Sequence, residues 1–180
     1  MSSIYSTNSW ATSTSYNVDD IVKNVDFYHY CLEPHTSPGA GSFDTLYNFT
    51  NNFANLWGGL ALDTNGETKP EFIWVPSYNL TVNNNPRVKS IKFGDGYEQR
   101  LKDGINNSLL ELDLSFENRS LSMTTAILHF LYTRQGTESF LFTPLSPYAT
   151  QKRFVCRSWT DTFVFYDNYT IRAKFEEVAN

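Results

Sequence analysis

The strongest constraint on the fold is a segment in which apolar and polar side chains alternate strictly. Residues 109–116 read LLELDLSF. A strand with one buried face produces this period of two, because successive side chains point to opposite sides of a sheet. The buried face of the predicted strand consists of Leu110, Leu112, Leu114 and Phe116. The chain must therefore form a sheet and supply a second layer to cover that face.

One segment has a helical pattern instead. Apolar residues recur at the spacing of one helix face at Met123, Ile127, Phe130 and Leu131. Ser120 or Ser122 precedes this stripe and is a suitable N-cap, and Gly136 stands where helices commonly end. These signals predict a helix near residues 121–134.

Other alternating or apolar segments predict further strands. They are residues 21–24, 27–32, 71–75, 87–93, 139–143, 152–159 and 169–178. The first two flank Val25-Asp26, which predicts a small hairpin with its turn there. Within the last 110 residues the order β-β-β-α-β-β-β predicts a largely antiparallel sheet or sandwich with one helix packed on it. The expected class is therefore mainly β with one helix, together with a small N-terminal β module.

A polar segment divides the chain. ALDTNGETKP, at 61–70, contains an Asn-Gly turn signal and ends in proline. We therefore expect a small β module at 1–62, a linker at 63–70 and a larger domain at 71–180.

Charge and composition exclude several classes of protein. The formal net charge is −5, and residues 1–69 hold seven acidic side chains against Lys23 and Lys69. A protein that binds nucleic acid specifically would show a basic excess, so no such binding is expected. The sequence lacks a signal peptide and the run of about 18 apolar residues that spans a membrane. We expect no membrane insertion, and assembly in the cytoplasm of a host cell. Cys31 and Cys156 fit either two buried thiols or a single disulfide.

The residues that usually perform catalysis are sparse. The histidines are His29 on a predicted strand, His35 in a loop, and His129, which the pattern places on the helix surface. Asp95 and Asp103 resemble an acid–base pair, but each lies beside glycine, where aspartate stabilises turns. We therefore expect no catalytic residue, no bound metal and no cofactor, and conclude that the chain is not an enzyme.

A charged loop is the best candidate for an assembly contact. Phe93-Gly94-Asp95-Gly96-Tyr97 predicts a tight turn, because glycine tolerates positive φ. The candidate assembly residues are Phe93, Gly94, Asp95, Gly96, Tyr97, Arg100, Lys102 and Asp103. In one interpretation the loop 93–106 reaches a neighbouring subunit or ring, with Arg87, Arg100 and Lys102 meeting Glu176 and Glu177 across an interface. In the other it is an ordinary solvated turn.

Five motifs follow one another in the last 110 residues. They are FIWVP at 72–76, RVKSIKFGDGYEQRLKDGIN at 87–106, ILHFLYTRQGTESFLFTP at 127–144, FVCRSW at 154–159 and YTIRAKFEEV at 169–178. In this order they resemble the phage minor tail protein M family of long, non-contractile tails. The resemblance covers roughly residues 70–180. It implies a tail-tube-like β-sandwich with a helix, in a structural virion protein of the tail tip.

The same resemblance implies partners. The chain would form a homo-oligomeric ring, expected to be a hexamer, that joins the tail tube protein to the distal tail or baseplate hub. DNA would pass through the lumen without being bound.

The N-terminal segment has a pattern of its own, made mainly of Trp10, Tyr16, Asp20-Ile21-Val22 and the spacing Tyr28-x-Tyr30-x-Leu32. This pattern is similar, more weakly, to type 5/12 chitin- or carbohydrate-binding modules. The candidate glycan-binding residues that it implies are Trp10, Tyr28, Tyr30 and Trp57. The alternative is that Trp10, Tyr28 and Trp57 form the core of a small domain. If the module binds sugar, the alternative function is adhesion to a host surface glycan.

Overall fold

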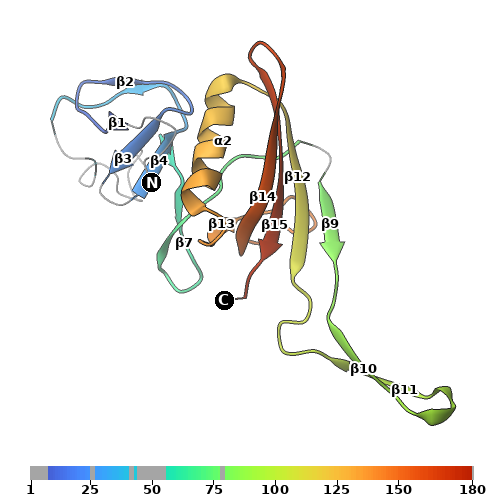
Figure 1. The fold of residues 1–180 in the computed structure, drawn as a ribbon. Helices are drawn as coiled ribbons and strands as arrows, with labels where there is room; N and C mark the ends of the chain where they lie inside the picture. The colour runs from blue at the N-terminus through green and yellow to red at the C-terminus, as the bar shows by residue number, and fades with distance from the viewer. Residues whose placement is uncertain (1–7, 25–26, 41–42, 44–55, 78–79, 180) are drawn as a thin grey trace.

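A computed structural model describes residues 8–24, 27–40, 43, 56–77 and 80–179. A small N-terminal β module lies beside a larger sheet that carries one helix, and a narrow hairpin projects from the far side (Figure 1). In the described residues this confirms the mainly β class, with one helix, α2, on the main sheet and an N-terminal β module. The turn predicted at Val25-Asp26 lies outside the described residues.

The larger part is built on one antiparallel five-stranded sheet. Its order is β13 (Phe140–Phe142), β14 (Lys152–Phe165), β15 (Asn168–Glu177), β12 (Leu110–Arg119) and β9 (Thr81–Asn84). The alternating face of β12 is buried as predicted, since Leu110, Leu112, Leu114 and Phe116 all lie in the core. β14 runs six residues beyond the predicted end at Trp159, and β9 was not predicted.

The helix has the predicted bounds. α2 spans Leu121–Arg134, and the Ser120 hydroxyl accepts a hydrogen bond from the Met123 N–H at 3.4 Å. Gln135 and Gly136 both adopt positive φ, so the chain leaves the helix there. Ile127, Phe130 and Leu131 pack into the core, and Met123 lies at its edge.

An extended segment completes the main core. Phe72 and Trp74 are buried between the helix and the sheet, and the Phe72 ring lies 5.1–6.1 Å from six aromatic rings (Trp74, Phe116, Phe130, Phe140, Phe142 and Phe175). The prediction of a strand at 71–75 is wrong. Only Glu71 forms a bridge, with Leu141, because the segment buries alternate side chains without joining the ladder.

The N-terminal module contains short strands and its own cluster. Its sheet has the order β1 (Asn8–Ser9), β3 (Ile21–Asn24), β4 (Phe27–Cys31) and β6 (Trp57–Gly58), and β2 (Ser15–Tyr16) pairs with β5 (His35–Thr36). The predicted β3–β4 hairpin is therefore confirmed. Its buried cluster consists of Tyr16, Val22, Cys31, Phe43 and Trp57. Cys31 and Cys156 are both buried free thiols.

The segment predicted as a linker is a bound hairpin. β7 (Leu60–Leu62) pairs with β8 (Thr68–Pro70), so residues 68–70 are not irregular as predicted. In the turn, the buried Asp63 carboxylate accepts hydrogen bonds from the backbone N–H groups of Asn65 and Glu67, and forms an ion pair with Arg153 of β14. These contacts, led by the Glu67 N–H, hold the pKa of Asp63 below its ordinary value. The hairpin is thereby tied to the main sheet.

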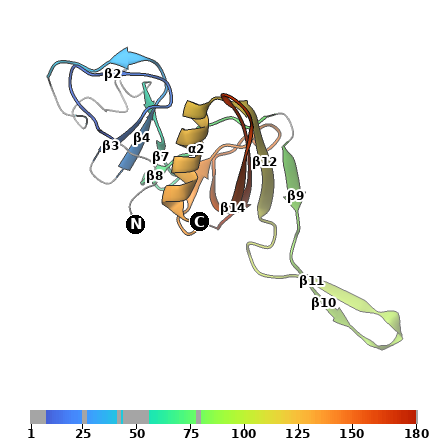
Figure 2. The same cartoon turned by 45° about the horizontal axis from the view of Figure 1, so that its top comes forward.

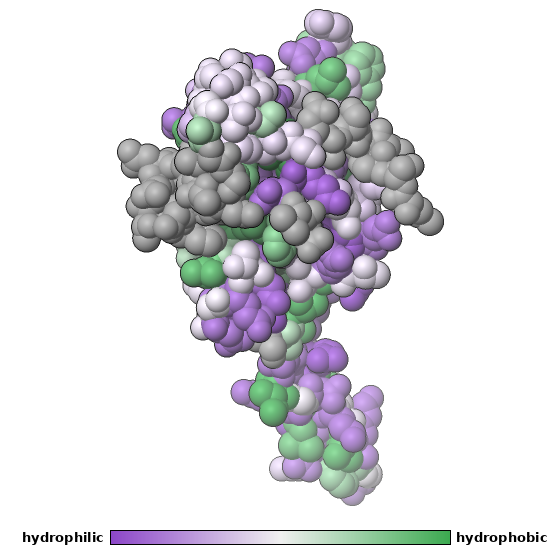
Figure 3. Space-filling view, turned by 90° about the vertical axis from the view of Figure 1, so that its left-hand side faces the viewer, coloured by the Kyte–Doolittle hydropathy of each residue, from purple (hydrophilic) through white to green (hydrophobic). Residues whose placement is uncertain are grey.

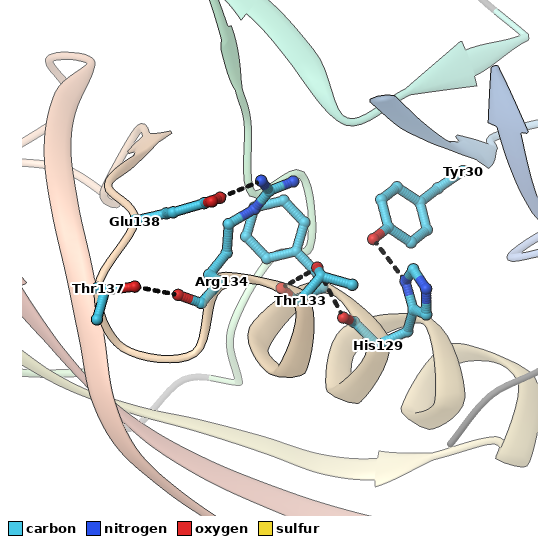
Figure 4. A network of polar contacts seen from close by, with 7 residues as sticks. Tyr30, His129, Thr133, Arg134, Thr137 and Glu138 are labelled. Atoms are coloured by element: carbon cyan, nitrogen blue, oxygen red, sulfur yellow. Dashed lines mark hydrogen bonds and ion pairs between the residues drawn. The ribbon is translucent and has the colours of Figure 1, made fainter. Parts of the chain in front are cut away.

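The N-terminal module packs directly on the helix. The Tyr30 hydroxyl and His129 Nδ1 are hydrogen-bonded at 3.1 Å (Figure 4), and Tyr30 belongs to the main core cluster. The Tyr28 ring meets the His129 ring edge-on at 4.6 Å. The prediction that His129 lies on the helix surface is wrong, because the module covers that side of α2 and buries the imidazole.

Burial of His129 makes stability depend on pH. Burial, and secondarily the charge of Arg134, lower the pKa of His129 from 6.5 to about 4. The unfolded chain therefore binds an extra proton between pH 6.5 and 4, and the folded state loses stability as the pH falls through that window. We expect wild type to lose on the order of 2 kcal/mol of unfolding free energy there.

The check is urea unfolding at several pH values for wild type and His129→Gln. The glutamine side chain can retain a hydrogen bond to Tyr30, but it does not titrate between pH 6.5 and 4 as the histidine of the unfolded wild type does. Its stability should change less with pH. An equal loss in both proteins would show that other groups cause the acid sensitivity.

Candidate functional site

A two-stranded hairpin, residues 87–106, projects from the main sheet, and we call it the arm. β10 (Val88–Lys92) and β11 (Glu98–Lys102) pair antiparallel, with a short turn of 3-10 helix, η2 (Gly94–Gly96), between them. Figure 2 shows the arm extending well away from the sheet below β9 and β12. Sequence reasoning found β10 and the turn but missed β11, which it treated as loop.

The turn requires one glycine. Asp95 and Gly96 adopt φ of 66° and 80°, whereas Gly94 is not in the positive-φ region. The expectation that at least one glycine of this turn needs a conformation costly for other residues is therefore confirmed at Gly96. The Phe93 N–H donates to the Tyr97 carbonyl at 2.8 Å and closes the turn.

The two faces of the arm differ. Cross-strand pairing places Lys89 opposite Leu101 and Ile91 opposite Gln99. Because side chains directly opposite share a face, Ile91, Leu101, Phe93 and Tyr97 form one largely apolar face, which also carries Lys89 and Gln99. Lys92, Glu98, Arg100 and Lys102 lie on the other face with Val88 and Ser90. Figure 3 shows hydrophobic and hydrophilic residues side by side along the projection.

Polar contacts fix the base and the charged face of the arm. The Asp103 N–H donates to the Arg87 carbonyl at 3.1 Å, and the Arg87 N–H donates to the Asn107 carbonyl at 2.7 Å. Glu98 accepts from the Ser90 hydroxyl and pairs with Arg100, and these contacts, Ser90 first, lower its pKa. All residues from 84 to 106 are exposed. A two-stranded hairpin without a partner layer is marginally stable in water, so this surface is suited to contact another protein.

All eight candidate assembly residues lie on the arm, Asp103 at its base. Glu176 and Glu177, the acidic side chains expected across an interface, form ion pairs within the same chain instead. Glu177 pairs with Lys152 and accepts the Leu110 N–H at 2.8 Å, and Glu176 pairs with Arg157. The idea that Arg87, Arg100 and Lys102 meet these two carboxylates across an interface therefore has no support in the structure.

The four candidate glycan-binding rings do not form one exposed surface. Tyr30 and Trp57 are each 1% exposed, in two different clusters, so neither can stack on a sugar. Tyr28 packs against His129, and Trp10 packs edge-on against Phe43. The prediction is wrong for Tyr30 and Trp57, because both rings are needed to fill cores.

A second exposed apolar surface was missed by sequence reasoning. Phe163, Val164, Phe165 and Tyr166, here called the tip, form the end of the β14–β15 hairpin. The signal was present as an apolar run, FVFY, directly before an Asp-Asn turn. The alternating pattern predicts that the preceding strand ends at Trp159, so these residues fall outside it.

The part of the chain that the structure describes lacks two other kinds of site. No group of three or more histidine, cysteine or acidic side chains is placed to hold a metal ion. No helix among these residues is long and apolar enough to cross a membrane.

Comparison with known proteins identifies the family. A model of the family described as phage minor tail protein matches residues 70–179, which include the sheet, the helix and the arm. The tail tip protein M of Escherichia phage lambda is 32% identical over 110 residues, which cover 61% of this chain and 97% of that protein. The N-terminal module lies before the matched region. The chain belongs to the phage minor tail protein family, and is accordingly a structural protein of the virion tail.

Proposed function

We propose that this protein forms a ring at the tail tip that joins the tail tube to the distal tail or baseplate hub. The observation that carries the proposal is the exposed, two-faced arm, which has the form of an assembly element and lies within the family match. The related tail tip protein M covers the same part of the chain. Partners are other copies of the chain, expected to number six, and the neighbouring tail proteins.

The sheet offers a way to build a continuous wall. β9 and β14 carry edges that no other described strand fully covers, since β9 pairs only with β12, and β13 pairs only with residues 152–154 of β14. Strand edges left open are sites where another chain can add. A contact between two different surfaces of the same subunit is heterologous and can close into a ring.

The charge of the chain suits a channel for DNA. Residues 70–180 carry twelve acidic and twelve basic side chains. A wall without a basic excess does not hold a polyanion in transit. We propose residues 71–180 as the channel wall and the N-terminal module, residues 1–62, on the outer circumference, where it leaves the bore open.

Immunogold labelling of assembled virions tests the location. Label is expected at the junction between tube and tail tip. Label along the whole tube, or only on fibres, would contradict the proposed joint. Adhesion to a host glycan is not favoured by a specific observation, because two of its four candidate rings are buried.

A further inference from the structure

The tip gathers four largely exposed apolar side chains at the end of the β14–β15 hairpin. Phe163, Val164, Phe165 and Tyr166 are 63%, 52%, 60% and 90% exposed. Figure 1 places the β14–β15 turn at the end of the sheet opposite the arm. Large apolar side chains gathered at one place mark a surface that another protein covers.

The backbone beside the tip is also open. β15 lies along one side of β14, and β13 covers only residues 152–154 on the other side. Within the described residues, the outer edge of Trp159–Phe165 therefore lacks a paired strand. The arm strands β10 and β11 pair only with each other there. Both surfaces can thus accept an additional strand.

The two surfaces carry opposite charge. Residues 87–103 of the arm contain five basic and three acidic side chains. Residues 158–170, around the tip, contain two acidic side chains, Asp161 and Asp167, and no basic one. Complementary charge steers surfaces together and selects against wrong pairings.

We infer that the arm of one copy docks on the tip and the adjoining β14 edge of the next copy. The apolar face of the arm covers Phe163 and Phe165, and Lys89, which lies on that same face, comes near Asp161. A second copy is the occupant because every copy carries both halves, so one repeated contact covers both exposed surfaces. The contact is heterologous, as ring closure requires. This inference rests on the proposed function, in which the arm serves assembly.

Disulfide trapping in assembled tails tests the contact. Each copy would carry Tyr97→Cys on the arm and Phe165→Cys in the tip, both at exposed positions. Mild oxidation should yield dimers and higher multimers on a non-reducing gel, whereas either single variant should stay monomeric. The native thiols Cys31 and Cys156 are buried and should not interfere. The matched control pairs Tyr97→Cys with Val75→Cys, an exposed position elsewhere.

Tails that contain the double variant without multimers, or with equal multimers in the Val75 control, would overturn the contact. If immunogold labelling still places the protein at the tail tip, either of these two trapping results would refute the contact between arm and tip but leave the proposed joint standing. Absence of label from the tail tip would refute the joint itself.

A charge exchange gives an independent readout. Asp161→Lys and Lys89→Glu should each lower incorporation into tails about tenfold, as expected for the loss of one interfacial charge interaction, because Lys89 lies on the docking face of the arm. The two changes together should restore much of it. Absence of any restoration would count against the pairing of arm and tip.

Discussion

A chain with a shortened arm is expected to fold normally and fail to assemble tails. Residues 88–102 would be replaced by an Asn-Gly turn. The Arg87 carbonyl and the Asp103 N–H already meet at 3.1 Å, so the shortened chain closes without strain in the sheet. Loss of a contact worth about 3 kcal/mol lowers association ~100-fold, and a ring multiplies that loss over its interfaces.

The measurement is the titre of infectious virions produced when the shortened chain is the only copy supplied. Thermal unfolding of the purified chain serves as the folding control and should change little. A normal titre would contradict an assembly role for the arm.

A finer version uses one matched pair on each face of the arm. Ile91→Ser with Leu101→Ser removes exposed apolar surface from the docking face, whereas Val88→Ser with Lys92→Ser changes two exposed side chains on the other face. Titre should fall for the first pair and stay near wild type for the second. Equal titres would show that the apolar side chains are dispensable.

The second large effect concerns the core. Phe72→Ala should lower the free energy of unfolding by about 3–5 kcal/mol, the usual cost of removing a buried phenylalanine. Phe72 is 2% exposed, and its ring lies among aromatic rings from the helix and from several strands of the sheet. Truncation would leave a cavity at the centre of the fold.

The unfolding temperature should fall by on the order of 10 °C, since 1 kcal/mol corresponds to about 2–4 °C for a chain of this size. Val75→Ala, three residues away and 63% exposed, is the control and should change little. A Phe72→Ala protein as stable as that control would mean that the extended segment is not part of the core.

The sequence correctly predicts an element when the spacing of its buried side chains matches the repeat of its backbone hydrogen bonds. β12 alternates because one face lies on the core, and α2 has a recognisable cap and stop. Residues 71–75 alternate equally well, yet only Glu71 joins a ladder. The pattern there reports burial of Phe72 and Trp74, and burial alone does not specify a strand.

The sequence does not predict elements that are exposed on both faces, or burial that depends on contacts with distant parts of the chain. β11 is exposed on both faces, so its sequence, EQRLK, carries no alternation that marks a strand. His129 lies on the side of α2 away from the main sheet, and only the docked N-terminal module buries it. A tertiary contact between residues 99 positions apart leaves no local signal. The sequence predicts the segment 93–106 as a candidate assembly contact, whereas its hairpin form and the exposed tip are seen only in the structure.

An electron-microscopic reconstruction of the tail tip tests the ring most directly. We expect copies of this chain to close around an open channel, with residues 71–179 forming the wall and the N-terminal module on the outer circumference. Each arm should contact the tip of another copy. A single copy mounted on a fibre, or the N-terminal module inside the lumen, would contradict the ring.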